Sequence, residues 1–502
     1  MPAEGIYILE SGIVPPPDDL WMRAGGKAHG LLKLAALGFP VPPGFVLPTT
    51  LGRDWLASVK PSLAEFKSAY AGVLERMERV CRHRFGDLRR PLLVSVRSSP
   101  PVSMPGMLNT VLNVGLTQSN IPGFIALTGN PRLAWDCYRF LIESYAQSVL
   151  DLDLHPFDAA TAAVLSAAKA QSVAELDTIT LRELVLQHLK LFSEITGEQF
   201  PEDPYAQLLG AIDSVFRSWN CERAKAYRRI SGLSDASGTA VMVQCMVFGN
   251  AGGRSGAGVG FTRDPASGDK HLYLDFAFDA QGEDVVAGRK PVSTGQELRS
   301  AFPDIVAALD GIAARLEGAF RYPQDFEFTV SDGKIYLLQT RDAKCSDWAR
   351  LKIAVDLVEE GVIGPEEALR RLEGLNSEKL VRRRLAATGT VLASGVSASV
   401  GVASGPIALS LEEVKAFEEE GQGAILVRSD IRTEDVEGIA TAAGVLTAKG
   451  GRTSHAAVIA RELGKVAIVG CRNLQIAEDG SSCIIGGHVL KPGATVTLDG
   501  ET

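Results

Sequence analysis

The chain has 502 residues, and at about 150 residues per domain this length predicts about three domains. Hydrophobic residues make up 46% and charged residues 22%, which excludes a chain too polar to pack a core. The net charge is -9, whereas nucleic-acid binders usually carry a basic surface. The composition therefore argues against nucleic acid as a partner.

The sequence also limits where the chain works. Residues 1–5 lack the basic segment and apolar run of a secretory signal. No stretch reaches the roughly 20 uninterrupted apolar residues that cross a membrane. The seven cysteines form no C-x-x-C pair, which argues against a disulfide framework or a zinc knuckle. We expect a protein of the reducing cytoplasm with no membrane partner.

The first part of the chain mixes short strands with turns. A buried strand is predicted over 91–96 and leads into Arg97. From about 116 to 235 the pattern becomes helical, because apolar residues recur at spacings of three and four, as in 181–192. We expect this stretch to form a helical insertion.

Strand patterns return in the middle of the chain. They cover 239–248, 270–278, 326–330 and 334–338. The last two runs are joined by the residues SDG at 331–333, and Asp-Gly between alternating runs is typical of a β-hairpin.

A charge-rich helical connector is predicted over 345–387. Gly361 and Gly364 break it into at least two helices, and glycines at such places are candidates for a hinge. After Gly389 the composition shifts to glycine, alanine, valine and isoleucine, with short strands and one strong helix. This indicates a separate compact α/β domain.

Two glycine-rich segments are candidates for phosphate binding, although neither is a Walker A or G-x-G-x-x-G motif. The residues GGK at 25–27 precede a helical pattern, which would direct backbone N–H groups and the Lys27 ammonium at a phosphate. The glycines of 249–258 would let the backbone approach a polyphosphate. An ordinary turn and a flexible hairpin are the alternative interpretations.

Oxygen donors and a cation lie on the predicted hairpin. Asp325 and Glu327 are two residues apart on one strand, and Gln339 lies on the next strand, so their oxygens are expected to converge on one cation. Arg341 follows Gln339 by two residues. The alternative is a structural salt bridge between Arg341 and Glu327.

A histidine lies in an unusual setting within GGRTSHAAVIAR at 450–461. A predicted strand over 444–448 leads into two glycines, and His455 falls in the first turn of a helix. The positive end of a helix disfavours imidazolium but favours a neutral nucleophile that acquires an anionic phosphoryl group. A buried structural histidine is the alternative, and metal ligation lacks partner ligands nearby.

Over nearly its full length the chain resembles the pyruvate phosphate dikinase family and, more loosely, phosphoenolpyruvate synthase. The resemblance rests on the histidine segment and on GGK at 25–27, LGFPVPPGF at 37–45, VSVRS at 94–98, VSMPGM at 102–107, QGEDVVAG at 281–288, QDFEFT at 324–329 and LQTR at 338–341.

The resemblance implies a multidomain α/β protein. Its parts would be an ATP-grasp nucleotide-binding domain over 1–344, with its helical insertion at about 116–235, a helical linker over 345–388, and a swivelling phosphohistidine domain over 389–502.

The resemblance also implies roles for particular residues, with ATP as substrate and Mg²⁺ as cofactor. His455 would accept the β-phosphoryl group of ATP, while the γ-phosphate passes to inorganic phosphate or water. The other implied contacts are Lys27, Arg97 and Arg341 with the phosphates, Glu283 with the ribose, backbone groups from Gln244 to Met246 with the adenine, and Asp325, Glu327 and Gln339 with magnesium.

A complete dikinase continues into a barrel of at least about 250 residues that binds pyruvate and phosphoenolpyruvate, whereas this sequence ends at Thr502. We therefore expect a donor subunit of a split dikinase, which delivers the phosphoryl group to pyruvate, a phenol or another hydroxyl compound on a partner subunit. One alternative is a non-catalytic, ATP-binding regulatory relative of a full-length dikinase. Another is an antibiotic-inactivating phosphotransferase, which should carry a large acceptor domain between the two halves.

Overall fold

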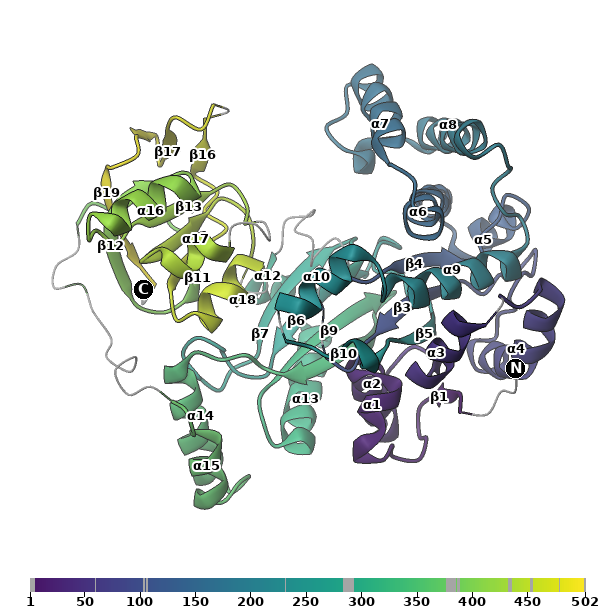
Figure 1. Cartoon of the computed structure of the whole chain (residues 1–502), viewed down its shortest axis with the longest axis horizontal. Coiled ribbons are helices and arrows are strands. Elements are labelled where there is room, and N and C mark those ends of the chain that lie inside the picture. Colours follow the sequence, from purple (N-terminus) through teal and green to yellow (C-terminus); the bar gives the residue numbers. More distant parts are fainter. Residues whose placement is uncertain are drawn as a thin grey trace. The chain divides into compact units, whose positions relative to one another are not determined.

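A computed structural model describes residues 5–58, 60–102, 104, 107–230, 232–282, 293–375, 385, 389–431, 436–451, 455–477 and 479–500. The chain divides into two compact units, whose elements are labelled in Figure 1. Unit 1 consists of Met1–Ala251 and Lys334–Gln339, and unit 2 consists of Gly252–Gly333 and Thr340–Thr502.

Unit 1 contains a five-stranded sheet in the order β1-β2-β5-β3-β4. Its neighbouring strands are antiparallel. The central strand is β5, and its apolar run from Val241 to Val243 is fully buried. The strands are β1 (Tyr7–Leu9), β2 (Gly44–Leu47), β3 (Val94–Ser99), β4 (Thr110–Val114) and β5 (Ala240–Cys245).

Helices account for most of unit 1. The helix α9 packs against β3 and β4 and buries Leu208, Ile212 and Phe216 in the core. Helices α5 to α10 lie between β4 and β5 in the chain, so the helical pattern predicted from about 116 to 235 is confirmed. The helices are η1 (Asp18–Leu20), α1 (Trp21–Ala24), α2 (Gly26–Ala36), α3 (Thr49–Ala57), α4 (Leu63–Cys81), α5 (Ile121–Thr128), α6 (Pro131–Leu150), α7 (His155–Ala168), η2 (Val173–Glu175), α8 (Thr178–Thr196), α9 (Pro204–Ser218), α10 (Glu222–Ile230) and η3 (Asp235–Ser237).

A second sheet has the order β10-β9-β6-β7-β8. The predicted Asp-Gly hairpin is confirmed, because β9 ends at Ser331 and β10 begins at Lys334. Asp332 and Gly333 have φ of 48° and 76°, as a two-residue type I′ turn requires. The strands are β6 (Gly256–Phe261), β7 (Tyr273–Phe278), β8 (Ser293–Thr294), β9 (Gln324–Ser331) and β10 (Lys334–Asp342).

Glycines in β6 make room for aromatic rings. A Cβ on Gly258 would overlap with the ring of Phe328, and one on Gly260 would overlap with the ring of Phe326. Aromatic packing inside the sheet therefore accounts for Gly258, which the sequence placed in a glycine-rich loop that approaches a phosphate.

Helices α12 (Gly295–Ala301), α13 (Pro303–Phe320), α14 (Asp347–Glu359) and α15 (Pro365–Arg371) also belong to unit 2. Gly361, with φ of 70°, follows the end of α14, and its N–H donates to the Val358 carbonyl. Gly364 is the N-cap of α15. Helix capping accounts for both glycines, and the expectation that they form a hinge stays a prediction.

A buried arginine ties the connector helix α14 to β6 and α13. Arg263 follows β6, and its side chain is 0% exposed. Its guanidinium nitrogens lie 2.6 Å from Glu317 in α13, 3.2 Å from Asp356 in α14 and 2.7 Å from Glu360 just after α14. Because a buried charge is stable only when it is paired, these elements are held as one block.

The C-terminal part of unit 2 is an α/β fold. Its main sheet has the order β11-β15-β14-β13-β12-β19, and the four central strands β15, β14, β13 and β12 are parallel. The antiparallel strands β16, β17 and β18 form a separate small sheet. The elements are β11 (Val396–Ser399), β12 (Val402–Ala408), α16 (Leu411–Glu419), β13 (Ile425–Arg428), α17 (Val436–Thr441), β14 (Gly444–Thr447), α18 (His455–Glu462), β15 (Val466–Val469), β16 (Leu474–Ile476), β17 (Cys483–Ile485), β18 (His488–Leu490) and β19 (Thr495–Asp499).

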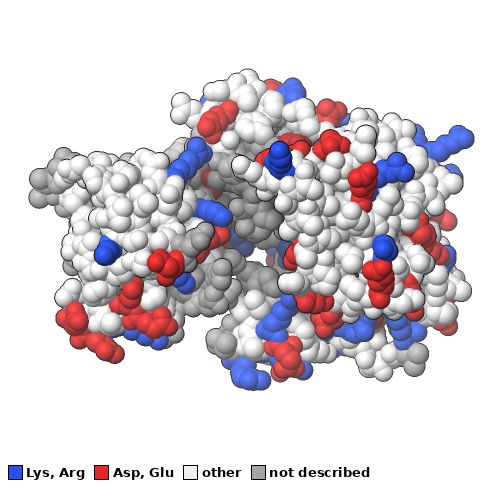
Figure 2. Space-filling view, turned by 90° about the horizontal axis from the view of Figure 1, so that it is seen from above, with Lys and Arg blue, Asp and Glu red and all other residues white. Residues whose placement is uncertain are grey.

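These elements confirm a mixed α/β multidomain protein. Among the described residues, every helix is too short or too polar to cross a membrane. On the face seen in Figure 2, acidic and basic side chains are interspersed rather than separated by sign.

We predict that Arg263→Met destabilises unit 2 by about 3 kcal/mol, because a buried acid loses its cation. Among the described residues, only the Thr262 hydroxyl would still donate a hydrogen bond to the Glu317 carboxylate. Thermal and urea unfolding of the full chain measure the effect. The control is Arg254→Met, which removes an exposed ion pair with Asp304 and should change stability little. Equal effects of the two substitutions would contradict the prediction.

Candidate functional site

The helix that carries Lys27 begins against the end of a strand of the same unit. Helix α2 starts at Gly26, and its first turn meets the residues that end and follow β3. The Gly26 N–H donates to the Pro100 carbonyl at 2.9 Å, and the Ala28 N–H donates to the Ser99 hydroxyl at 2.9 Å. A Cβ on Gly25 would overlap with the Ser99 carbonyl oxygen, so only glycine permits this approach.

These bonds correct one expectation from the sequence. The N–H groups at the start of α2 were expected to face a phosphate, which is wrong for Gly26 and Ala28 because Pro100 and Ser99 accept their bonds. The half-buried Lys27 lies between them in the first turn. These two N–H groups are therefore not available to a phosphate, and the contact expected from Lys27 stays a prediction.

The other predicted nucleotide contacts of unit 1 lie on β3 and at the end of β5. Arg97 pairs with Met242 across these two strands. Gln244 is buried and donates from its side chain to the Pro42 carbonyl at 2.9 Å. The Met246 N–H donates to the Leu93 carbonyl at 2.9 Å.

An adenine edge would have to use carbonyl groups near the end of β5. The N–H groups of Cys245 and Met246 already donate within unit 1, to Pro43 and Leu93. A carbonyl oxygen has two lone pairs and accepts a second bond. The predicted backbone contact with adenine would therefore be made by a carbonyl oxygen, which accepts a hydrogen bond from the adenine amino group.

In unit 2, a buried acid of β9 forms an ion pair with an arginine of β10. Arg341 lies with its Nε 2.7 Å from Oδ2 of Asp325, and Asp325 is only 7% exposed. The alternative interpretation of the sequence was a salt bridge between Arg341 and Glu327. In the structure, the carboxylate that pairs with Arg341 is that of Asp325. Burial raises the pKa of Asp325, and the neighbouring Arg341 opposes this rise.

Sequence reasoning missed a third acid on the same face of this sheet. Val259 in β6 pairs with Asp275 in β7 on one side and with Glu327 in β9 on the other. Laterally paired residues share a face, so Asp275 joins the face of Asp325 and Glu327. Asp275 is 4% exposed and accepts a bond from the Tyr273 hydroxyl at 2.8 Å. An acid within an otherwise apolar strand was the signal available in the sequence.

The acids of β9 fit a magnesium ion that also binds to phosphate groups. Asp325 and Glu327 offer carboxylate oxygens, which Mg²⁺ prefers. Among the described residues, no cluster of three or more acids, histidines or cysteines could hold a metal. Mg²⁺ commonly binds to one or two carboxylates and to phosphates and water, and Asp325 and Glu327 supply that number. Gln339, the third predicted ligand, lies two residues before Arg341 on β10.

His455 is the first residue of α18, so the prediction that it opens a helix is confirmed. The preceding strand is β14, and Gly450 has a φ of 100° between the two elements. Ala457 and Ala460 are fully buried, which fixes the helix against its sheet. Residues 452–454 and Glu283, the predicted ribose contact, lie outside the described residues.

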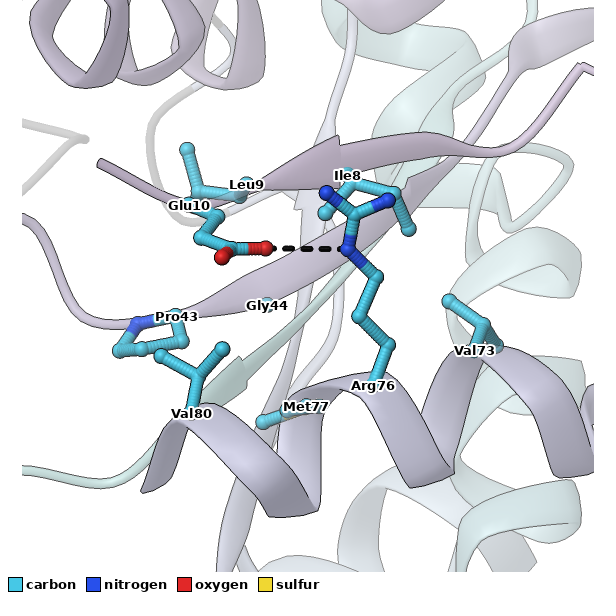
Figure 3. A pocket seen from close by; sticks show the side chains of 9 residues that line it. All are labelled: Ile8, Leu9, Glu10, Pro43, Gly44, Val73, Arg76, Met77 and Val80. Carbon is cyan, nitrogen blue, oxygen red and sulfur yellow. Dashed lines mark hydrogen bonds and ion pairs between the residues drawn. The ribbon is translucent and has the colours of Figure 1, made fainter. Parts of the chain in front are cut away.

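A small hollow in unit 1 contains none of the candidate residues (Figure 3). Glu10 and Arg76 form an ion pair across it, with Nε of Arg76 3.0 Å from the Glu10 carboxylate. The hollow is otherwise mainly apolar and lies between β1, β2 and α4. Its lining residues are Ile8, Leu9, Glu10, Pro43, Gly44, Val73, Arg76, Met77 and Val80.

Comparison with known proteins places these features in a family context. Residues 63–297 match the model "Pyruvate phosphate dikinase, AMP/ATP-binding domain", and residues 420–502 match "PEP-utilising enzyme, mobile domain". The chain is 40% identical over 509 residues to pyruvate, phosphate dikinase of Clostridium symbiosum, across 100% of this chain and 57% of that protein. It is 37% identical over 518 residues to the Rhizobium meliloti (strain 1021) protein of the same name, with the same two coverages.

A plant protein is similar to this chain to about the same degree. Pyruvate, phosphate dikinase 2 of Zea mays is 38% identical over 482 residues, across 95% of this chain and 54% of that protein. The chain thus spans little more than half the length of these curated relatives. The resemblance to the pyruvate phosphate dikinase family is confirmed, for an AMP/ATP-binding domain and a mobile domain of PEP-utilising enzymes.

We predict that Gly25→Ala destabilises unit 1 far more than Gly38→Ala. Both glycines have positive φ, of 78° and 73°, and the ψ of 160° at Gly25 places it in a region that essentially only glycine adopts. Gly38 has open space around its Cα, whereas a Cβ on Gly25 meets Ser99. Thermal unfolding of the two variants measures the difference, and equal losses would show that α2 does not depend on this close approach.

Proposed function

We propose that the chain is the phosphohistidine-forming part of a dikinase-type phosphotransferase. In this proposal the γ-phosphate of ATP passes to inorganic phosphate or water, the β-phosphoryl group passes to His455, and AMP leaves. The observation that carries the proposal is the joint match of an AMP/ATP-binding domain and a mobile domain, with His455 at the first residue of α18 within the second match.

The start of α18 suits a group that becomes negatively charged. A helix N-terminus carries a partial positive charge and disfavours a protonated imidazole. A neutral imidazole nitrogen is the nucleophile that phosphoryl transfer needs. The same helix end would then favour the anionic phosphohistidine, so a helix start suits the neutral nucleophile and the anionic product of the proposed reaction.

The residues proposed to hold ATP divide by chemistry. Lys27, Arg97 and Arg341 are proposed to bind the phosphates, because cations make charge-assisted hydrogen bonds to phosphate oxygens. Gln244 and Met246 are proposed to contact the adenine, and Glu283 the ribose.

Asp325, Glu327 and Gln339 are proposed to hold Mg²⁺, which would neutralise phosphate charge when bound. The ion pair with Asp325 gives Arg341 a second proposed task, because it holds a buried carboxylate in place beside the ion. The buried acid Asp275 adds a third carboxyl group to the same sheet face.

We propose that the acceptor, which is pyruvate, a phenol or another hydroxyl compound, binds to a separate partner subunit. One histidine would then receive the phosphoryl group in one place and deliver it in another, so residues 389–502 are proposed to swivel as a domain.

The seven cysteines are all free, which supports the cytoplasm as the proposed compartment.

We predict that the chain labels itself from ATP that carries ³²P at the β-phosphate in the presence of Mg²⁺. The label should be acid-labile and base-stable, as a phosphohistidine is, and it should be absent in His455→Ala. The control is His488→Ala, which removes an exposed histidine of β18 and should label normally. Label arriving only from the γ-phosphate would refute the dikinase assignment, and binding of ATP without labelling would favour a regulatory relative.

We also predict that Lys27→Ala and Arg341→Ala each slow this labelling about tenfold or more, since a charge-assisted phosphate contact is worth about 1.5–3 kcal/mol. Single-turnover labelling at subsaturating ATP measures the loss. The matched control is Lys33→Ala, which removes another lysine of α2, one that pairs with Asp18. If Lys27→Ala and Arg341→Ala label as fast as Lys33→Ala, neither residue binds the phosphates.

A further inference from the structure

The helix that carries Lys27 is capped by a residue far away in the chain. Ser99 is the last residue of β3, and its side chain is fully buried. Its hydroxyl accepts the Ala28 N–H at 2.9 Å, and the next carbonyl, of Pro100, accepts the Gly26 N–H at 2.9 Å. The N–H groups of the residues on either side of Lys27 therefore donate to β3 and to the residue after it.

Helix α2 has no cap of its own. Its N-cap residue is Gly25, which has no side chain, and its first turn contains no acid. The first N–H groups of a helix need acceptors from elsewhere. By contrast, α4 is capped locally, since its N-cap Ser62 accepts the Glu65 N–H. Ser99 does for α2 what Ser62 does for α4, but across 71 residues of sequence.

The same strand carries a second cation. Arg97 lies two residues before Ser99 on β3, so both side chains are on one face of the strand. Because Ser99 turns its hydroxyl toward α2, Arg97 lies on the face of β3 that meets this helix. The bond from Ser99 to Ala28 thus sets the position of Lys27 relative to Arg97.

We propose that Ser99 is a positioning residue for polyphosphate binding, which it supports by holding Lys27 at a fixed place beside Arg97. This inference rests on the proposed function, in which both cations bind ATP phosphates. Ser99 itself makes no contact with the nucleotide in this proposal. Its hydroxyl is already used as the acceptor for α2.

The test is calorimetric titration of the full chain with MgATP. Ser99→Ala should weaken binding about tenfold, because small displacements of a positioned charge are costly. Ser62→Ala removes a cap of the same chemistry from α4 and should stay within about twofold of the wild type, as distant sites act independently. Ser99→Cys keeps about the size of serine but is a weak acceptor, so it should also weaken binding about tenfold, and it is the test variant if Ser99→Ala does not fold.

A double-mutant cycle separates positioning from general weakening of unit 1. In a Lys27→Ala background, Ser99→Ala should change MgATP affinity by less than about twofold, because the group that it positions is gone. Multiplication of the two losses would overturn the inference, and so would wild-type affinity in Ser99→Ala. In parallel, hydrogen exchange at the Ala28 amide should be slow in the wild type and fast in Ser99→Ala.

The exchange measurement also distinguishes this inference from the proposed function. Slow exchange at Ala28 in a wild-type chain that does not bind MgATP would overturn the proposed function, and the positioning role with it. A wild-type chain that binds MgATP, together with a Ser99→Ala variant that loses protection but no affinity, would overturn the positioning role alone.

Discussion

The requirement that buried charges and buried N–H groups find partners determines how the elements of both units are joined. In unit 2, Arg263 lies in the interior, and its neutralisation by Glu317, Asp356 and Glu360 ties β6 to α13 and α14. In unit 1, the uncapped start of α2 is completed by Ser99. In each case the partner comes from a distant part of the chain, so satisfying one group positions two elements.

Glycines act in the same way by removing side chains where two elements must approach closely. Gly25 admits the Ser99 carbonyl to the start of α2, and Gly258 and Gly260 admit phenyl rings over β6. The chain contains 51 glycines, and a glycine-rich stretch is easily taken for a phosphate loop. In the described parts of the segments 25–27 and 249–258, close packing within the protein explains Gly25 and Gly258 without a ligand.

Local signals allowed much of the fold to be predicted from the sequence. Three of these features depend on residues that are close together in the chain. They are the Asp332-Gly333 turn, the helices between 116 and 235, and the helix that begins at His455. The pairing of Arg341 with Asp325 instead of Glu327 could not be read in that way, because it depends on strand twist and side-chain direction. Asp275 joins this group only through the register of β6 with β7 and β9. Motif reasoning alone therefore does not give the partners of these residues, which depend on contacts between strands.

The phosphate chemistry proposed for this chain then rests on side chains more than on backbone dipoles. The N–H groups of Gly26 and Ala28 at the start of α2, and of Cys245 and Met246 at the end of β5, all donate to acceptors of unit 1. A P-loop binds phosphate through free backbone N–H groups, and these four are committed elsewhere. In the proposed function, lysine and arginine side chains bind the phosphates, and their precision is limited by how firmly their own backbone is held. For that reason the proposal assigns an effect on affinity to Ser99, a buried serine that makes no ligand contact.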